Sequence, residues 1–146
     1  MNKYKRIDFD LKEGKKVKLR FYESPEYKNL LWGGWFTVKV GTYFFDKFDL
    51  NEQRVIVWHE LYHAKHSLFN WLFDSIRLWF DSKKIKWSTE FRADKFAASN
   101  CGRENTLKFL RKIKEFYQNG VVKYNSKTHP PIDERIKRVE SFLCIK

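Results

Sequence analysis

The chain has 146 residues, of which 42% are hydrophobic and 33% charged, so it is long enough to fold as one domain around its own core. Its two cysteines, Cys101 and Cys144, lie far apart and outside any CxxC context, which excludes a disulfide framework and a zinc knuckle. The net charge of +12 permits binding to nucleic acid, anionic membranes or acidic peptides, but the basic residues are scattered and no run resembles a basic arm.

No targeting or membrane segment is recognisable. The first residues have no apolar stretch of the kind found in a secretory signal. The most apolar stretch, Leu68 to Phe80, contains Asp74 and Arg77 and is too short to span a bilayer as a helix. We therefore expect a cytoplasmic protein without stable membrane insertion.

The N-terminal third predicts a small sheet. Residues 1–14 are polar and charged and are interpreted as a tail or entry segment. The alternation of apolar and polar residues over 17–22 indicates a half-buried strand, which Ser24-Pro25 ends. Aromatic and β-branched residues over 30–45, interrupted by glycines, predict two further short strands. The expected sheet is mostly antiparallel.

The rest of the chain predicts helices. Asn51 is a candidate cap for a helix that runs to about His66, and a second apolar helical stretch follows over 68–80. After a polar linker, residues 81–86, Ser88 or Thr89 would open a helix that stops at Gly102. Two amphipathic helices over 107–117 and 132–142 complete an α+β fold, in which the sheet lies beside the first helix.

The strongest chemical signal is His59-Glu60-Leu61-Tyr62-His63. Residues four apart lie on one face of a helix, so His59 and His63 can reach a single ion at roughly 2 Å each. Zinc lowers the pKa of a bound water toward about 7, and Glu60 would take the proton of that water as it attacks a carbonyl. Such a pentapeptide also occurs by chance, and both histidines would then be ordinary surface or core residues.

A catalytic zinc needs a third protein ligand, and Glu90 and Asp94 share one helical face downstream. One carboxylate can bind zinc while Asp94 orients a zinc-bound histidine by accepting its free ring N–H. Alternatively, both are solvated helix residues. His66 is a rival ligand, but it lies about 10 Å along the helix from His59, too far to share one ion with it.

Three separated motifs resemble those of one peptidase family. They are His59-Glu60-x-x-His63, Glu90-x-x-Ala93-Asp94, and Thr128-His129-Pro130-Pro131 followed by Arg135-Ile136. Together they are similar to the zinc peptidases of the HtpX and type I CAAX prenyl protease family, which are gluzincins. Most members are membrane enzymes, and the small soluble minigluzincins are closer in size.

The resemblance implies a single zincin-like metallopeptidase domain over residues 1–146. It assigns one zinc ion per chain to His59, His63 and Glu90, the general base to Glu60 and an orienting role to Asp94. His129 would stabilise the oxyanion of the tetrahedral intermediate, although it also fits as a turn residue. Arg135 would pair with a nearby carboxylate or lie exposed. The substrate would bind as an extended strand along a sheet edge, for which the stretch Trp32 to Phe36 is the candidate.

The leading hypothesis is therefore a zinc endopeptidase that acts on peptides or unfolded proteins. Some soluble relatives are thought to be latent, and residues 1–14 or the C-terminal end could block this site in the same way. Two other hypotheses stay open: a basic, nucleic-acid-associated regulator whose HExxH site is not proteolytic, and a metal-binding interaction module without turnover. The ligand set suits several divalent ions, and the sequence leaves the oligomeric state undecided, a dimer included.

Overall fold

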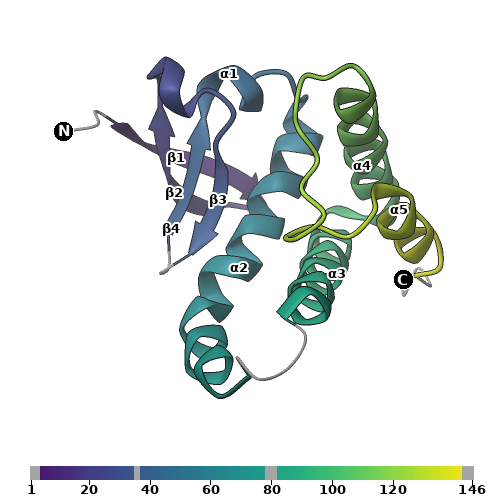
Figure 1. Ribbon diagram of the computed structural model, residues 1–146. Helices are drawn as coiled ribbons and strands as arrows, with labels where there is room; N and C mark the ends of the chain where they lie inside the picture. Colours follow the sequence, from purple (N-terminus) through teal and green to yellow (C-terminus); the bar gives the residue numbers. More distant parts are fainter. Residues whose placement is uncertain (1–3, 35–36, 78–81, 143–146) are drawn as a thin grey trace.

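The computed structural model describes residues 4–34, 37–77 and 82–142, and only the backbone for residues 67–77 and 82. It has the expected α+β architecture. A four-stranded sheet lies on one side of the long helix α2 (Leu50–Arg77), and α3 (Ser82–Cys101), α4 (Arg103–Gln118) and α5 (Ile132–Glu140) lie on the other (Figure 1). Helix α2 is therefore the central element of the fold.

The strand order in the sheet is β1-β2-β4-β3. Strands β1 (Tyr4–Lys12) and β2 (Lys15–Tyr22) form an antiparallel hairpin, and β3 (Leu31–Gly34) pairs antiparallel with β4 (Thr37–Gly41). The central pair, β2 with β4, is parallel. The sheet is consequently mixed rather than simply antiparallel, and β3 forms one of its edges.

Residues 4–12 correct the interpretation of residues 1–14 as a tail or entry segment, because they form a strand that pairs with β2 from Tyr4 to Asp10 and again at Lys12. Strand β1 is the outer edge of the sheet, and most of its side chains are exposed. Its charged composition hides the alternation of Ile7, Phe9 and Leu11, of which Leu11 is buried in the core.

Two predicted helix boundaries are also wrong. The helix expected to end near His66 continues to Arg77, so the apolar stretch that begins at Leu68 extends α2 rather than forming a second helix. Residues 78–80 of that stretch lie outside the described residues. The predicted polar linker over 81–86 is helical from Ser82 onward, because α3 begins six to seven residues earlier than Ser88 or Thr89 suggested. No helix among the described residues combines the length and apolarity needed to cross a membrane.

The N-terminus of α2 is capped by Asp49, not by Asn51. The Asp49 carboxylate accepts a hydrogen bond from the Glu52 backbone N–H (2.9 Å), and the Glu52 carboxylate accepts one from the Asp49 N–H (2.9 Å). This reciprocal pair is a capping box. Glu52 is buried, and Lys112 of α4 contributes the ammonium group that neutralises it, at 3.1 Å.

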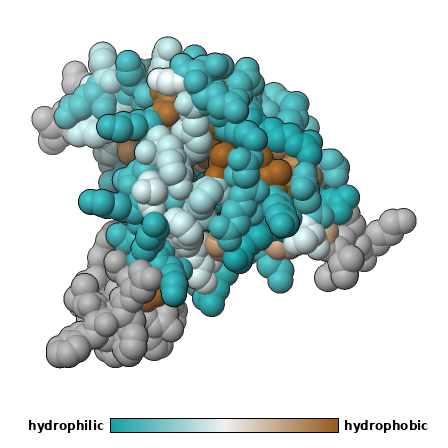
Figure 2. All heavy atoms as spheres, turned by 45° about the vertical axis from the view of Figure 1, so that its right-hand side comes forward, coloured by the Kyte–Doolittle hydropathy of each residue, from teal (hydrophilic) through white to brown (hydrophobic). Residues whose placement is uncertain are grey.

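The core fills the space between the sheet and the helices. On the face that Figure 2 shows, hydrophilic residues cover most of the surface and hydrophobic residues appear only as small patches. The 3₁₀ turn Pro25–Tyr27 and the short helix α1 (Thr42–Phe45) flank the sheet, and the two phenylalanines of α1 are buried. The other large apolar side chains that are fully enclosed among the described residues come from β2, β4, α2, α4 and α5: Leu19, Val38, Val40, Val55, Ile56, Val57, Leu110 and Val139.

Gly33 of β3 fixes how closely the edge strand approaches α2. A Cβ atom at this position would lie 1.9 Å from the backbone oxygen of Glu60. Only a residue without a side chain allows this contact, since the atom it would meet belongs to the helix backbone and cannot rotate away.

We expect Gly33→Ala to lower the free energy of unfolding by about 1–3 kcal/mol, because strand and helix must move apart to admit the methyl group. Gly34→Ala is the matched control: its new Cβ would meet the Trp32 ring, a side chain that can turn aside. Urea denaturation of both variants checks this prediction. Equal losses of stability in the two variants would show that the contact between Gly33 and the Glu60 backbone does not set the distance between β3 and α2.

Candidate metal centre

His59 and His63 project from one face of α2 into the space between α2 and α3. Their Nε2 atoms lie 3.2 Å apart, as the four-residue spacing predicts. His59 is buried at 6% exposure, whereas His63 is partly exposed. Two imidazole nitrogens are thus held toward a common point.

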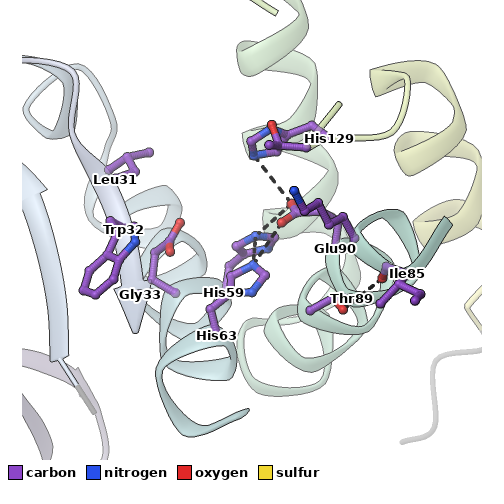
Figure 3. A pocket seen from close by; sticks show the side chains of 12 residues that line it. Leu31, Trp32, Gly33, His59, His63, Ile85, Thr89, Glu90 and His129 are labelled. Carbon is purple, nitrogen blue, oxygen red and sulfur yellow. Dashed lines mark hydrogen bonds and ion pairs between the residues drawn. The ribbon is translucent and has the colours of Figure 1, made fainter. Parts of the chain in front are cut away.

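Glu90 of α3 supplies the third donor. Its Oε1 lies 3.1 Å from His63 Nε2 and its Oε2 lies 3.4 Å from His59 Nε2. In Figure 3 the two histidines and Glu90 converge on one another from two helices. The sequence-based grouping of His59, His63 and Glu90 is therefore reproduced by the packing of α2 against α3.

These three residues fit a metal ion. Ligand atoms about 2.0–2.1 Å from a tetrahedral zinc ion are about 3.3–3.4 Å from each other. The two histidine nitrogens are 3.2 Å apart, and each lies 3.1–3.4 Å from a different oxygen of the Glu90 carboxylate. Glu90 Oε2 is buried and has no hydrogen-bond partner among the described residues. An unsatisfied buried carboxylate oxygen costs free energy that coordination of a cation would remove.

Behind this group, Asp94 and Arg135 form a buried pair. Arg135 donates two hydrogen bonds to the Asp94 carboxylate, at 2.8 and 2.7 Å. Asp94 Oδ1 also lies 3.0 Å from His59 Nδ1, though off the line of the ring N–H, so this contact is electrostatic rather than an aligned hydrogen bond. Asp94 thus lies beside His59, as predicted, but the expected hydrogen bond from the ring N–H is not formed, and Arg135 is buried rather than exposed.

The carboxylates set the charge state of the cluster. Burial alone would lower the pKa of His59, but Asp94 and Glu90 outweigh it and raise that pKa to about 10. Burial would raise the pKa of Asp94, yet Arg135 and His59 hold it at about 2. The metal-free cluster thus carries an imidazolium at His59, and a metal ion must displace its proton in order to bind.

Glu60 follows His59 on α2 and lines the adjoining cleft, where burial raises the pKa of its carboxyl group. The cleft has a volume of about 510 Å³. Its walls come from β3, α2, α3 and the loop before α5, as Figure 3 shows for Leu31, Trp32, His63, Thr89 and His129. The expected edge strand therefore borders the group formed by His59, His63 and Glu90, although residues 35–36 of the predicted stretch lie outside the described residues.

His129 reaches the same cleft from the loop between α4 and α5. Its Nε2 lies 3.8 Å from Glu90 Oε2, and burial lowers its pKa. The Thr128 hydroxyl lies 2.7 Å from His129 Nδ1, closer than its 3.3 Å to the Asn125 backbone oxygen. The hydroxyl hydrogen can go to the Asn125 oxygen or to Nδ1; when it goes to Nδ1, the ring proton lies on Nε2, the nitrogen near Glu90.

His66 lies outside the cluster, as expected. Its ring stacks on that of Tyr62, with centroids 4.1 Å apart, and its Nδ1 lies 2.8 Å from the Tyr62 backbone oxygen. The sequence interpretation missed Ile85 and Thr89, which line the cleft from the first turns of α3. Their four-residue spacing was the available signal, but the predicted linker over 81–86 included Ile85 and so separated it from Thr89.

Comparison of the chain with models of protein families, with curated proteins and with solved structures gives no match.

The geometry predicts that the wild-type chain binds about one zinc ion and that His63→Ala and Glu90→Ala each weaken this binding at least tenfold, because each removes one of three ligand atoms. Equilibrium dialysis against a competing chelator measures this. His66→Ala is the control, since it removes a histidine of the same helix that lies outside the cluster. Unchanged affinity in Glu90→Ala would contradict the assignment of Glu90.

We expect Arg135→Met to lower the free energy of unfolding by about 3–5 kcal/mol, because it leaves the buried Asp94 carboxylate without its partner. Arg111→Met, which breaks an exposed pair with Glu140, should cost less than about 1 kcal/mol. Urea denaturation of the metal-free proteins compares the two. Similar losses would mean that the buried pair contributes no more than a surface one.

Proposed function

We propose that the protein is a zinc-dependent endopeptidase with a zincin-like site. The observation that carries this proposal is the convergence of His59, His63 and Glu90 at a cleft that Glu60 also lines. Two imidazoles and one carboxylate leave an open position on a tetrahedral ion, which is the arrangement of a catalytic rather than a structural zinc site. The resemblance of the three sequence motifs to HtpX-like gluzincins supports the same activity.

The residues divide the chemistry among them. When bound, zinc would supply a Lewis acid that polarises the scissile carbonyl and acidifies a water. The Glu60 carboxylate takes the proton of the attacking water and passes it to the leaving amine. His129 donates its Nε2 hydrogen toward the negative charge that develops on the carbonyl oxygen, which lowers the barrier because the donor is already in place. Asp94 keeps the His59 ring oriented.

The edge strand β3 supports a peptide rather than a small-molecule substrate. Its outer backbone edge is not paired with another described strand, and Leu31 to Gly33 border the cleft. An extended peptide that adds to this edge gains main-chain hydrogen bonds independent of sequence. Its scissile bond would then lie across Glu60 and the metal ligands.

The position of β1 argues against a latent form in which this N-terminal strand blocks the cleft. Residues 4–12 lie at the opposite edge of the sheet from β3, so this segment does not cover the cleft. A latent form would therefore have to use another part of the chain.

The proposal predicts that Glu60→Gln reduces hydrolysis of an unfolded protein such as casein by about 10²–10⁴-fold, because the general base is lost. Zinc content should stay the same as in the wild type, since Glu60 is not among the three ligand residues. Release of peptides and metal content are measured on the same samples, with the exposed Glu104→Gln as the control. Zinc binding without any hydrolysis by the wild type would favour a metal-binding module instead.

A further inference from the structure

The sheet has a second face, which shares only the edge residue Trp32 with the described walls of the cleft. Side chains alternate along a strand, and one set, which includes Leu19, Phe21, Val38 and Val40, packs into the core toward α2. The alternate set faces away from α2. It is rich in basic and aromatic residues from all four strands and also contains two acidic residues of β1 and a threonine of β4: Tyr4, Arg6, Asp8, Asp10, Lys16, Lys18, Arg20, Tyr22, Trp32, Thr37 and Lys39.

Three cations of this outer face form one continuous row. Arg6 of β1 is the register partner of Arg20 of β2, and Arg20 is the partner of Lys39 of β4. Neighbouring strands are about 4.8 Å apart, so the three charges cross the sheet within roughly 10 Å. Trp32 of β3 continues the row as the partner of Lys39. A linear array of this kind suits an anion with regularly spaced charges.

Aromatic rings accompany these cations. The Arg20 guanidinium lies 5.0 Å from the centroid of the Tyr4 ring, and the Lys39 ammonium lies 4.4 Å from that of Trp32. Tyr4 and Trp32 remain 37% and 38% exposed. Beside the row, an open hollow of about 320 Å³ is lined by Tyr22, Tyr27, Leu30, Trp32 and Lys39. The hollow offers flat apolar walls with a cation at its margin.

Nearby acidic side chains do not neutralise the positive charge of the Arg6–Arg20–Lys39 row. Glu23 is paired with Lys5 at 2.6 Å, and Asp10 is paired with Arg54 at 3.3 Å. Asp8 lies opposite Lys18, one step along the strands from the Arg6–Arg20 pair. The net charge of +12 adds a long-range attraction for polyanions.

We propose that the outer face of the sheet binds single-stranded nucleic acid, with phosphates on the Arg6–Arg20–Lys39 row and an unpaired base in the hollow beside Tyr27. Basic grooves combined with aromatic stacking surfaces are what such ligands require. An anionic membrane would use the cations but has no flat group for the hollow, and duplex DNA keeps its bases stacked inside. This binding function is additional to the proposed peptidase activity and needs no metal.

The test uses fluorescence anisotropy of a labelled, mixed-sequence single strand of about 20 nucleotides, which exceeds a site of about 4–16 nucleotides. The double variant Arg20→Gln/Lys39→Gln should weaken binding about tenfold or more. It should also make the slope of log affinity against log salt concentration shallower by about 1.4, that is, about 0.7 for each lost phosphate contact. Lys114→Gln/Lys137→Gln removes the same charge from the helical side and should change affinity about twofold or less. Tyr27→Leu should weaken binding about fivefold or more with an unchanged slope. Circular dichroism confirms that each variant is folded.

Three results would overturn the proposal. Equal losses of affinity in the two double variants would mean that binding depends only on the net charge of the protein. Tighter binding to the matching duplex than to the single strand would exclude the binding of an unpaired base in the hollow. Binding to phosphatidylserine vesicles that depends on Arg20 and Lys39, without binding to the oligonucleotide, would assign the face to a membrane. The Glu60→Gln variant should bind the single strand like the wild type, so failure of the peptidase proposal leaves this result intact.

Discussion

The whole arrangement depends on four buried ionisable side chains, His59, Glu90, Asp94 and Arg135, that must satisfy one another inside an apolar core. Removing a charge from water costs several kcal/mol unless a partner lies at hydrogen-bond distance. His59 belongs to α2, the two carboxylates to α3 and Arg135 to α5. Three helices separated in sequence are therefore held by a single electrostatic network, so the site and the fold are stabilised by the same contacts.

Local spacing was sufficient to predict most of this network from sequence. The four-residue repeats within α2 and α3 place His59 beside His63 and Glu90 beside Asp94 wherever a helix forms, whatever else the chain does. What sequence alone could not decide was whether the two helices meet, because that depends on packing between residues far apart in the chain. The buried position of Arg135 was undecided for the same reason, as its partner lies 41 residues away.

The sheet was predicted less well, for physical reasons. Strand order and the parallel pairing of β2 with β4 arise from contacts that leave no local signature. Strand β1 has most of its side chains in solvent, so its sequence resembles a polar tail more than a strand. Likewise, residues 82–86 of the predicted linker are helical, because the polar residues Lys83, Lys84 and Lys86 are good helix formers as well as good loop residues.

The contact between Gly33 and the Glu60 backbone has a consequence for how β3 can vary over evolution. Inward-facing Gly33 touches the helix backbone directly, so any larger residue there widens the distance between the edge strand and the proposed general base. Its neighbour Trp32 faces the other way and meets no such barrier. Tolerance to substitution should thus alternate from residue to residue along the strand. The inward position fixes the width of the cleft, whereas Trp32, which borders both the cleft and the outer hollow, can change without moving the helix.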